Sequence, residues 1–206
     1  RRKMDMGAEQ QLSKFLDTYF YPWMKQDYKY DISRILDKEW QLKGVDVIVK
    51  TKSRQIYVDE KAQLYYINEN LPTFAFEINF MNKQGNLSQG WLFNNDLITE
   101  YYLLIWPYAK CKNLKLIKGK DFTELDCLMI QREKIQKFLI NKGWPSQRLY
   151  EEAQKLRSYN QYGKTKIKNE TEFYFYYSNP KYYKEQPVNV IIRKGTLIEL
   201  ADQRYK

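Results

Sequence analysis

Histidine is absent from this chain of 206 residues, and cysteine occurs only twice. The lack of histidine excludes Ser-His-Asp and Cys-His catalysis, histidine-dependent zinc sites and nucleases that use a histidine base. Cys111 and Cys127 have no paired metal-ligand spacing and cannot form a disulfide framework. Any catalysis must therefore rely on carboxylates, lysine, tyrosine, serine or a metal ion held by oxygen ligands.

Long apolar runs are also missing. No stretch reaches the roughly eighteen apolar residues of a transmembrane helix, so we expect no membrane span. The N-terminal segment RRKMDMGAEQ lacks the apolar region of a secretory signal. Hydrophobic residues make up 43% of the chain and aromatic residues 17%, which is enough for a folded core. These features predict a soluble, cytoplasmic protein.

The charge is strongly unbalanced toward the basic side. There are 35 lysines and arginines against 25 acidic residues, a formal net charge of +10. Such an excess favours a polyanionic partner through phosphate contacts and counterion release, with DNA expected in preference to RNA. A composition rich in lysine and tyrosine and poor in glycine explains the same excess without any ligand.

Hydrophobic periodicity predicts a mixed α/β protein. We expect helices at 7–25 (with Pro22 where its pattern closes), 132–142 and 146–157, and strands at 39–49, 55–63, 73–80, 99–109, 172–178 and 188–201. Ser146 is the expected N-cap of the last helix. The predicted organisation is an α/β core with a C-terminal helix pair over residues 1–163 and a β appendage over residues 164–206, packed on the same domain.

The pair of strands expected at 39–49 and 55–63 carries the most informative residues. Asp46 and Asp59 each interrupt an apolar strand, which is costly unless another group pairs with the carboxylate or a metal ion binds it. Because side chains alternate along a strand, Asp59, Lys61 and Gln63 share one face. In a hairpin of adjacent strands, Asp46 lies beside that face.

Two carboxylates and a backbone carbonyl are suitable ligands for Mg²⁺, which keeps several waters in its octahedral shell. Such a metal ion polarises a phosphodiester oxygen and lowers the pKa of a bound water. Lys61 would position that water or offset the charge that develops at the phosphorus. The grouping therefore predicts phosphodiester hydrolysis with Mg²⁺, or with Mn²⁺ in its place.

These residues resemble the PD-(D/E)xK nuclease superfamily, in which an aspartate ends one strand and a (D/E)xK triplet lies on the next. Asp46 matches the first acid, and Asp59, Glu60 and Lys61 match the triplet, with Glu60 as its variable middle residue. The resemblance covers residues 7–109, about half of the chain. It implies a restriction-endonuclease-like fold, a mixed sheet flanked by helices, and a DNA endonuclease with Asp46 and Asp59 as metal ligands.

The same resemblance suggests further site residues. The family commonly adds a glutamate from the preceding helix, and Glu9 is the candidate for a third ligand. Gln63 could touch the site or the nucleic acid. Arg148, in the pair of helices around Gly143-Trp144-Pro145, is a weaker candidate for DNA contact. Two features depart from the family: Gly44-Val45 precedes the first acid in place of a proline, and residues 84–99 lack an obvious crossover helix.

Other interpretations compete with a nuclease. Asp46, Asp59 and Lys61 could form a cross-strand ion pair on a solvent-facing hairpin. The chain could be a non-catalytic nucleic-acid-binding module that keeps the nuclease fold, or a structural subunit whose charges only solubilise it. The aromatic segment EFYFYYSNPKYY could stack on bases, although core packing explains it equally well. A recombinase with a tyrosine nucleophile is a distant further alternative.

Overall fold

The structure is a computed structural model that describes the backbone of residues 2–206 and the side chains from residue 6 onward. It confirms an α/β fold and divides the chain into two compact units. Unit 1 comprises Arg1–Leu71, Ile98–Gln131 and Ala201–Lys206, and unit 2 comprises Pro72–Leu97 and Arg132–Leu200. These boundaries differ from the expected division at residue 163, because a strand from the middle of the chain pairs with one near its C-terminus.

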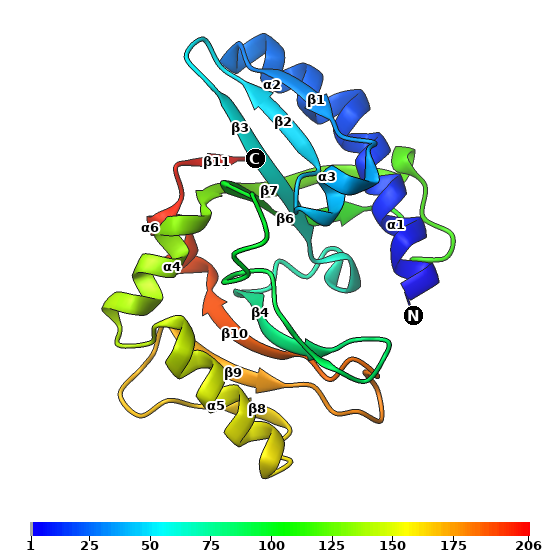
Figure 1. The fold of residues 1–206 in the computed structure, drawn as a ribbon. Helices are drawn as coiled ribbons and strands as arrows, with labels where there is room; N and C mark the ends of the chain where they lie inside the picture. Colours follow the sequence, from blue (N-terminus) through cyan, green and yellow to red (C-terminus); the bar gives the residue numbers. More distant parts are fainter. Residues whose placement is uncertain (1) are drawn as a thin grey trace. The chain divides into compact units, whose positions relative to one another are not determined.

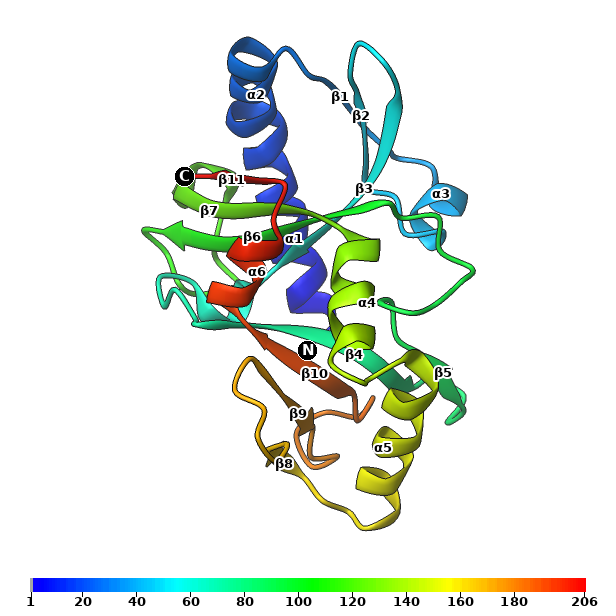
Figure 2. The same ribbon diagram turned by 90° about the vertical axis from the view of Figure 1, so that its left-hand side faces the viewer.

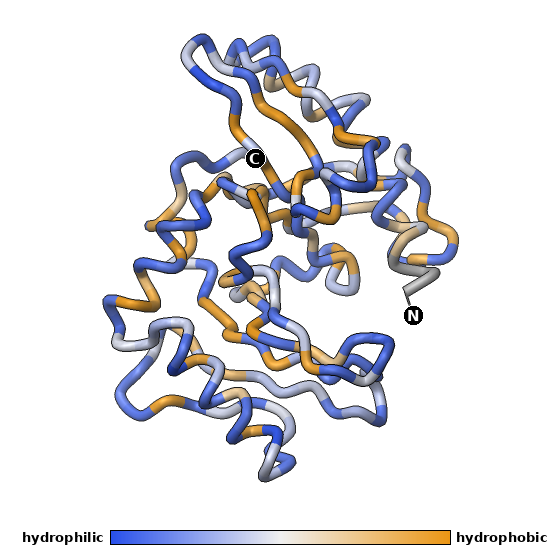
Figure 3. The backbone as a smooth tube through the Cα atoms, in the orientation of Figure 1, coloured by the Kyte–Doolittle hydropathy of each residue, from blue (hydrophilic) through white to orange (hydrophobic). Residues whose placement is uncertain are grey.

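Unit 1 contains a six-stranded mixed sheet in the order β1-β2-β3-β6-β7-β11 (Figure 1). Four neighbouring pairs are antiparallel, whereas β3 and β6 run parallel. The strands are β1 (Asp31–Arg34), β2 (Val47–Lys50), β3 (Gln55–Ala62), β6 (Tyr101–Ala109), β7 (Phe122–Gln131) and β11 (Gln203–Tyr205). In Figure 3, β2 is largely hydrophobic and the turn that joins it to β3 is hydrophilic, as expected of a hairpin.

The N-terminal helical segment of unit 1 is longer than the sequence pattern predicts. α1 (Arg2–Phe15) continues through a π-helical turn, η1 (Leu16–Phe20), into α2 (Tyr21–Tyr28). Pro22 lies in the first turn of α2 and therefore does not end the helix at that point. The wider π turn just before it accommodates a residue that has no N–H to donate.

The core of unit 1 lies between this helical segment and one face of the sheet. Val58, Leu103 and Ile105 project from β3 and β6, and Leu12 and Met24 pack in the same cluster from the helical side. All five side chains are almost completely buried. Burial of this face leaves the alternate residues of β3 on the opposite face of the sheet. Short helices complete the unit: α3 (Lys38–Leu42), η2 (Leu64–Tyr66) and η3 (Gly119–Asp121).

Unit 2 contains a five-stranded antiparallel sheet in the order β5-β4-β10-β9-β8, with α4 and α5 on one face (Figure 2). Phe138 of α4 contacts Phe173, and Trp144, just before α5, contacts Phe175. The elements are β4 (Thr73–Met81), β5 (Leu87–Gln89), α4 (Arg132–Asn141), α5 (Ser146–Ser158), β8 (Gly163–Thr165), β9 (Phe173–Tyr177), β10 (Val188–Arg193) and α6 (Lys194–Leu200).

Several sequence predictions need correction. Residues 38–42 form α3 because Asp37 caps it, its carboxylate accepting hydrogen bonds from the Glu39 and Trp40 amides. The strand expected at 188–201 ends at Arg193 and continues as α6. Ser146 is the first residue of α5 and makes no capping bond, because Pro145 occupies the cap position.

The helices of the structure also bear on membrane association. None of those that the structure describes is long and apolar enough to cross a membrane.

Candidate active site

The β2–β3 hairpin brings Asp46 opposite Asp59. Val47 pairs with Val58 in the antiparallel register, so the residue before β2 faces the residue after Val58. The Asp46 amide donates a hydrogen bond of 2.9 Å to the Val58 carbonyl, which extends the ladder by one residue beyond the strand. This pairing holds the two aspartates side by side at the start of β2.

The two carboxylates and Lys61 form one cluster on the same face of the sheet. One carboxylate oxygen of Asp46, Oδ2, accepts a hydrogen bond of 2.8 Å from the Glu60 amide. Lys61 Nζ donates a hydrogen bond of 2.7 Å to Asp59 Oδ1. The Asp59 side chain is only 4% exposed, whereas that of Lys61 is 29% exposed. The cluster therefore joins a buried acid to a base that reaches solvent.

The electrostatics of this cluster are unfavourable to the ionised form of Asp59. Burial raises the pKa of Asp59 to about 7; the Lys61 ammonium opposes that rise, and the charge and hydrogen bonding of Asp46 add to it. One lysine does not compensate for two adjacent carboxylates in a desolvated position. A cation that binds both carboxylates would favour their ionised form.

The chain before Asp46 is fixed by a tight turn. Gly44 adopts a positive φ of 77°, which a glycine accepts without steric cost. Its carbonyl accepts a hydrogen bond of 2.6 Å from the Thr99 hydroxyl, immediately before β6 begins. Trp40 also packs on the Tyr57 ring, with 5.5 Å between centroids. The loop that carries Asp46 is thus tied to both β3 and the start of β6.

Glu60, between the two cluster residues of β3, points to the opposite face of the sheet. Its carboxylate accepts two hydrogen bonds of 2.9 Å from Arg34 of β1. The Tyr21 hydroxyl of α2 donates a further hydrogen bond to it. Burial raises the pKa of Glu60 against the opposing effect of Arg34, and Arg34 is itself held by Asp17 at 2.7 Å. Glu60 is therefore the acid end of an ion-pair network that fastens the helical segment to the sheet.

The remaining site residues expected from the sequence lie apart from the Asp46–Asp59–Lys61 cluster or beside it. Glu9 is exposed on α1. Among the residues whose side chains are described, no three acids, histidines or cysteines come together in a group that could hold a metal ion. Gln63 follows β3, and its backbone N–H donates a hydrogen bond of 3.0 Å to the Ile105 carbonyl. Arg148 belongs to unit 2, where it donates a hydrogen bond to the Gly143 carbonyl and stacks on Trp144.

The cluster suits a hard divalent cation that needs few protein ligands. Mg²⁺ is commonly bound by one or two carboxylates, with waters and substrate phosphates completing its shell. Asp46 and Asp59 supply two carboxylates in contact, and the raised pKa of Asp59 indicates a position that is short of positive charge. The donor set therefore fits Mg²⁺ or Mn²⁺, and it lacks the sulfur and nitrogen ligands that favour zinc.

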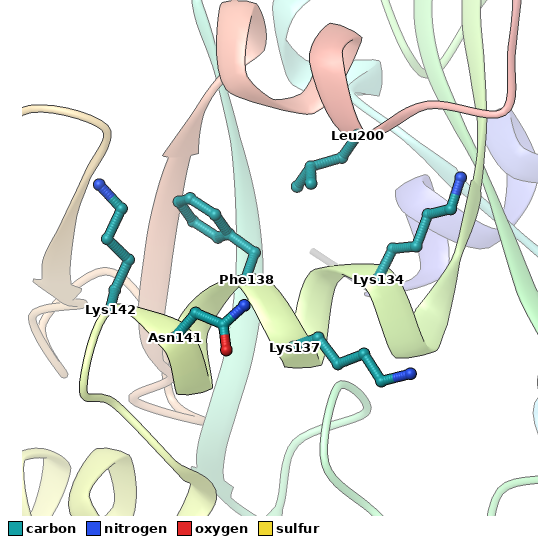
Figure 4. Close-up of a pocket in the computed structure, with 6 residues that line it drawn as sticks. All are labelled: Lys134, Lys137, Phe138, Asn141, Lys142 and Leu200. Atoms are coloured by element: carbon teal, nitrogen blue, oxygen red, sulfur yellow. The ribbon is translucent and has the colours of Figure 1, made fainter.

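A separate pocket in unit 2 has a different character. Figure 4 shows Phe138 of α4 and Leu200 of α6 pointing toward one another, with Lys134 and Lys142 on either side. No acidic side chain is among the residues that line it. Lys142 already forms ion pairs with Glu170 and Glu172. This pocket has no metal ligands and no nucleophile, so it is not the site of the predicted chemistry.

Sequence reasoning overlooked the role of Glu60, which it treated as a variable position within a triplet. The available signal was Arg34, a basic residue able to pair with Glu60. It was missed because Arg34 lies on β1, a strand that the periodicity did not predict. Comparison with known proteins adds no assignment: no family model, curated protein or solved structure matches this chain.

Proposed function

We propose that this chain is a Mg²⁺-dependent nuclease of restriction-endonuclease-like fold that hydrolyses phosphodiester bonds, with DNA as the favoured substrate. One observation carries the proposal. Asp59 is buried, interacts with the Asp46 carboxylate and accepts a hydrogen bond from Lys61, so that two acids and one lysine meet at the start of β2. Such a group is costly for a purely structural hairpin and is suited to binding a cation beside a phosphate.

The architecture supports the same proposal. A mixed sheet flanked by helices is what the family resemblance implies. Asp59 lies on β3, and Asp46 immediately precedes β2, the antiparallel neighbour of β3. The family's crossover helix between β3 and β6 is replaced here by a different connection, in which the chain forms β4 and β5 of unit 2. An insertion at that point leaves the strand pairing of Asp59 and Lys61 with β6 intact.

Each residue of the cluster has a distinct proposed role. Asp46 and Asp59 would hold the metal ion, which when bound supplies Lewis-acid polarisation of the phosphodiester and a more acidic water. Lys61 is placed to leave its bond with Asp59 and stabilise negative charge on the phosphate as the nucleophile adds. The Glu60 amide keeps Asp46 aimed at the cluster through its hydrogen bond. Glu9 is given no role, because α1 packs against the face of the sheet opposite the cluster.

The direct test is cleavage of plasmid DNA, linear duplex DNA, single-stranded DNA and RNA in Mg²⁺ or Mn²⁺. We expect cleavage of at least one substrate, complete loss in EDTA, and a loss of about 10²- to 10⁴-fold in Lys61→Ala. Lys50→Ala is the matched control, because it removes an exposed lysine at the far end of β2. Equal activity in both variants, or an inert wild-type protein, would rule out the proposed enzyme.

A non-catalytic nucleic-acid-binding module is the second candidate. It is favoured by the fact that, within the described side chains, only two acids come together and Lys61 already neutralises one of them. This candidate predicts salt-dependent binding that is the same in Mg²⁺ and in EDTA, with no cleavage. The nuclease predicts tighter binding in a non-hydrolysing metal such as Ca²⁺ than in EDTA.

A further inference from the structure

The sheet of unit 2 has a face that no helix of that unit covers. On β9 the side chains alternate: Phe173, Phe175 and Tyr177 are buried toward α4 and α5, whereas Tyr174 and Tyr176 point the other way. Tyr176 is 41% exposed. Two tyrosines on the outer face of a strand next to the sheet edge are an unusual placement for large rings that core packing does not require.

Lysines border these two rings. Lys164, on the edge strand β8, pairs with Tyr176 in the strand register. Its Nζ atom lies 4.0 Å from the centre of the Tyr174 ring. Lys166 and Lys168 follow β8 directly in the chain, and both are exposed. We call Tyr174, Tyr176 and Lys164, with the two following lysines, the tyrosine–lysine face.

The charge around this face is positive. Five lysines are exposed between residues 159 and 184, namely Lys164, Lys166, Lys168, Lys181 and Lys184. The two acids of that stretch, Glu170 and Glu172, are both ion-paired with Lys142. Glu77 of β4 is an acidic residue on the same face of the sheet, but the strand β10 separates it from the two tyrosines. The lysines therefore remain available to a polyanion.

The spacing of the rings selects the form of that polyanion. Alternate residues of a β-strand lie about 6.6 Å apart along the strand, whereas stacked bases of a duplex rise about 3.4 Å per nucleotide. Successive bases can therefore each meet a ring only when they are unstacked. Aromatic rings interleaved with basic side chains are the means by which proteins bind single strands without reading their sequence.

We propose that the tyrosine–lysine face is a binding site for single-stranded nucleic acid, with Tyr174 and Tyr176 stacking on bases and Lys164, Lys166 and Lys168 contacting phosphates. This site lies in unit 2 and is separate from the Asp46–Asp59–Lys61 cluster of unit 1. It deepens the proposed function by naming a strand form that the nuclease would hold, but its binding does not depend on metal chemistry.

The alternative explanation of these residues is structural: they protect the edge strand β8 from pairing with another chain. Lysines on an exposed edge deter pairing with another chain, and a lysine over a tyrosine ring adds modest stability. That explanation predicts no preference between single-stranded and duplex nucleic acid, and no effect of the tyrosines on binding.

Fluorescence anisotropy in EDTA separates the two explanations. The probes are labelled oligo(dT), oligo(U) and a hairpin duplex of equal charge, each titrated at two salt concentrations. We expect wild type to bind at least one of the single strands more tightly than the duplex. Tyr176→Ala should weaken single-strand binding about 5- to 50-fold and leave duplex binding unchanged. Lys164→Gln should reduce the salt dependence by about one phosphate contact.

The matched control is Tyr159→Ala, which removes a tyrosine that is 74% exposed in the same unit but follows α5, outside the sheet. The inference fails if Tyr176→Ala and Tyr159→Ala bind alike, or if wild type prefers the duplex. Its failure is distinguishable from failure of the nuclease proposal. Asp59→Asn should retain single-strand binding, and loss of cleavage without loss of that binding would leave this site standing.

Discussion

Asp59 and Glu60 are neighbours on β3, but their carboxylates lie on opposite faces of the sheet and have different partners. Glu60 faces the helical segment and is matched by two hydrogen bonds from Arg34 and one from Tyr21. Asp59 faces the other side of the sheet, where its partners are one lysine and a second carboxylate. Asp59 is buried and the Glu60 side chain is only 10% exposed, but only Glu60 is paired with a guanidinium.

The difference separates an acid with a structural partner from the acid that the proposed function would use. A buried carboxylate that is paired with arginine contributes to a fixed network and leaves no room for a cation. A buried carboxylate beside another acid raises the cost of ionisation and creates a demand for positive charge. The Glu60 side therefore holds the fold together, and the Asp59 side is the one expected to bind a metal ion.

The largest expected effect comes from breaking the structural side. Arg34→Met should lower the free energy of unfolding by about 3–5 kcal/mol, because it leaves the Glu60 carboxylate buried without its partner. Urea denaturation followed by circular dichroism measures this change. Arg54→Met is the control: Arg54 is half-exposed and lies 3.9 Å from Glu100, so its loss should cost well under about 1 kcal/mol. Equal losses would show that Glu60 is not the structural acid.

The next effect is the pH dependence of stability that Asp59 causes. Below the unfolded pKa of 3.8 Asp59 is protonated in both states, but between that value and about 7 only the folded protein keeps the proton. Its contribution to stability is therefore present at low pH and lost as pH rises through 7. In EDTA, Asp59→Asn should remove a fall in unfolding free energy of up to roughly 4 kcal/mol over this window. A variant with the slope of wild type would contradict this interpretation.

The smallest expected effect isolates the contribution of Lys61. Its ammonium lowers the pKa of Asp59, so Lys61→Met should raise the midpoint of Asp59 titration by about one pH unit. Carbon-detected NMR of the aspartate carboxyl groups, recorded without metal, follows that midpoint directly. Lys50→Met, at the exposed end of β2, should leave it unchanged. An unchanged midpoint in Lys61→Met would show that the lysine acts elsewhere.

Much of this arrangement was predictable from local pattern. Alternation on 55–63 places Asp59 and Lys61 on one face, and the structure has them on β3 with their side chains in contact. The strand at 73–80 was also predicted, and Phe74, Phe76 and Ile78 are buried as expected. These segments have a strict period of two, which leaves one choice of face.

Long-range pairing was not predictable in the same way. In the alternating segment at 73–80, Asn79 occupies a polar position, but it is only 2% exposed. It lies at the register shift between β4 and β10, and Arg157 donates a hydrogen bond to its side chain. The segment at 122–131, FTELDCLMIQ, has no strict alternation of apolar and polar residues, yet it forms β7, which pairs with both β6 and β11. Unit 2 depends on the pairing of β4 with β10, which lie more than a hundred residues apart in the chain. No local pattern encodes such a separation.

The most direct test of the account is Mn²⁺ binding, measured by the loss of the electron paramagnetic resonance signal of free Mn²⁺ at pH 8. Wild type should remove about one ion per chain, and Asp46→Asn and Asp59→Asn should each lose that binding. Glu60→Gln should retain it, provided that circular dichroism shows a folded protein. Binding that survives in both aspartate variants, or that is absent from wild type, would contradict the assignment of a metal site to this face of β3.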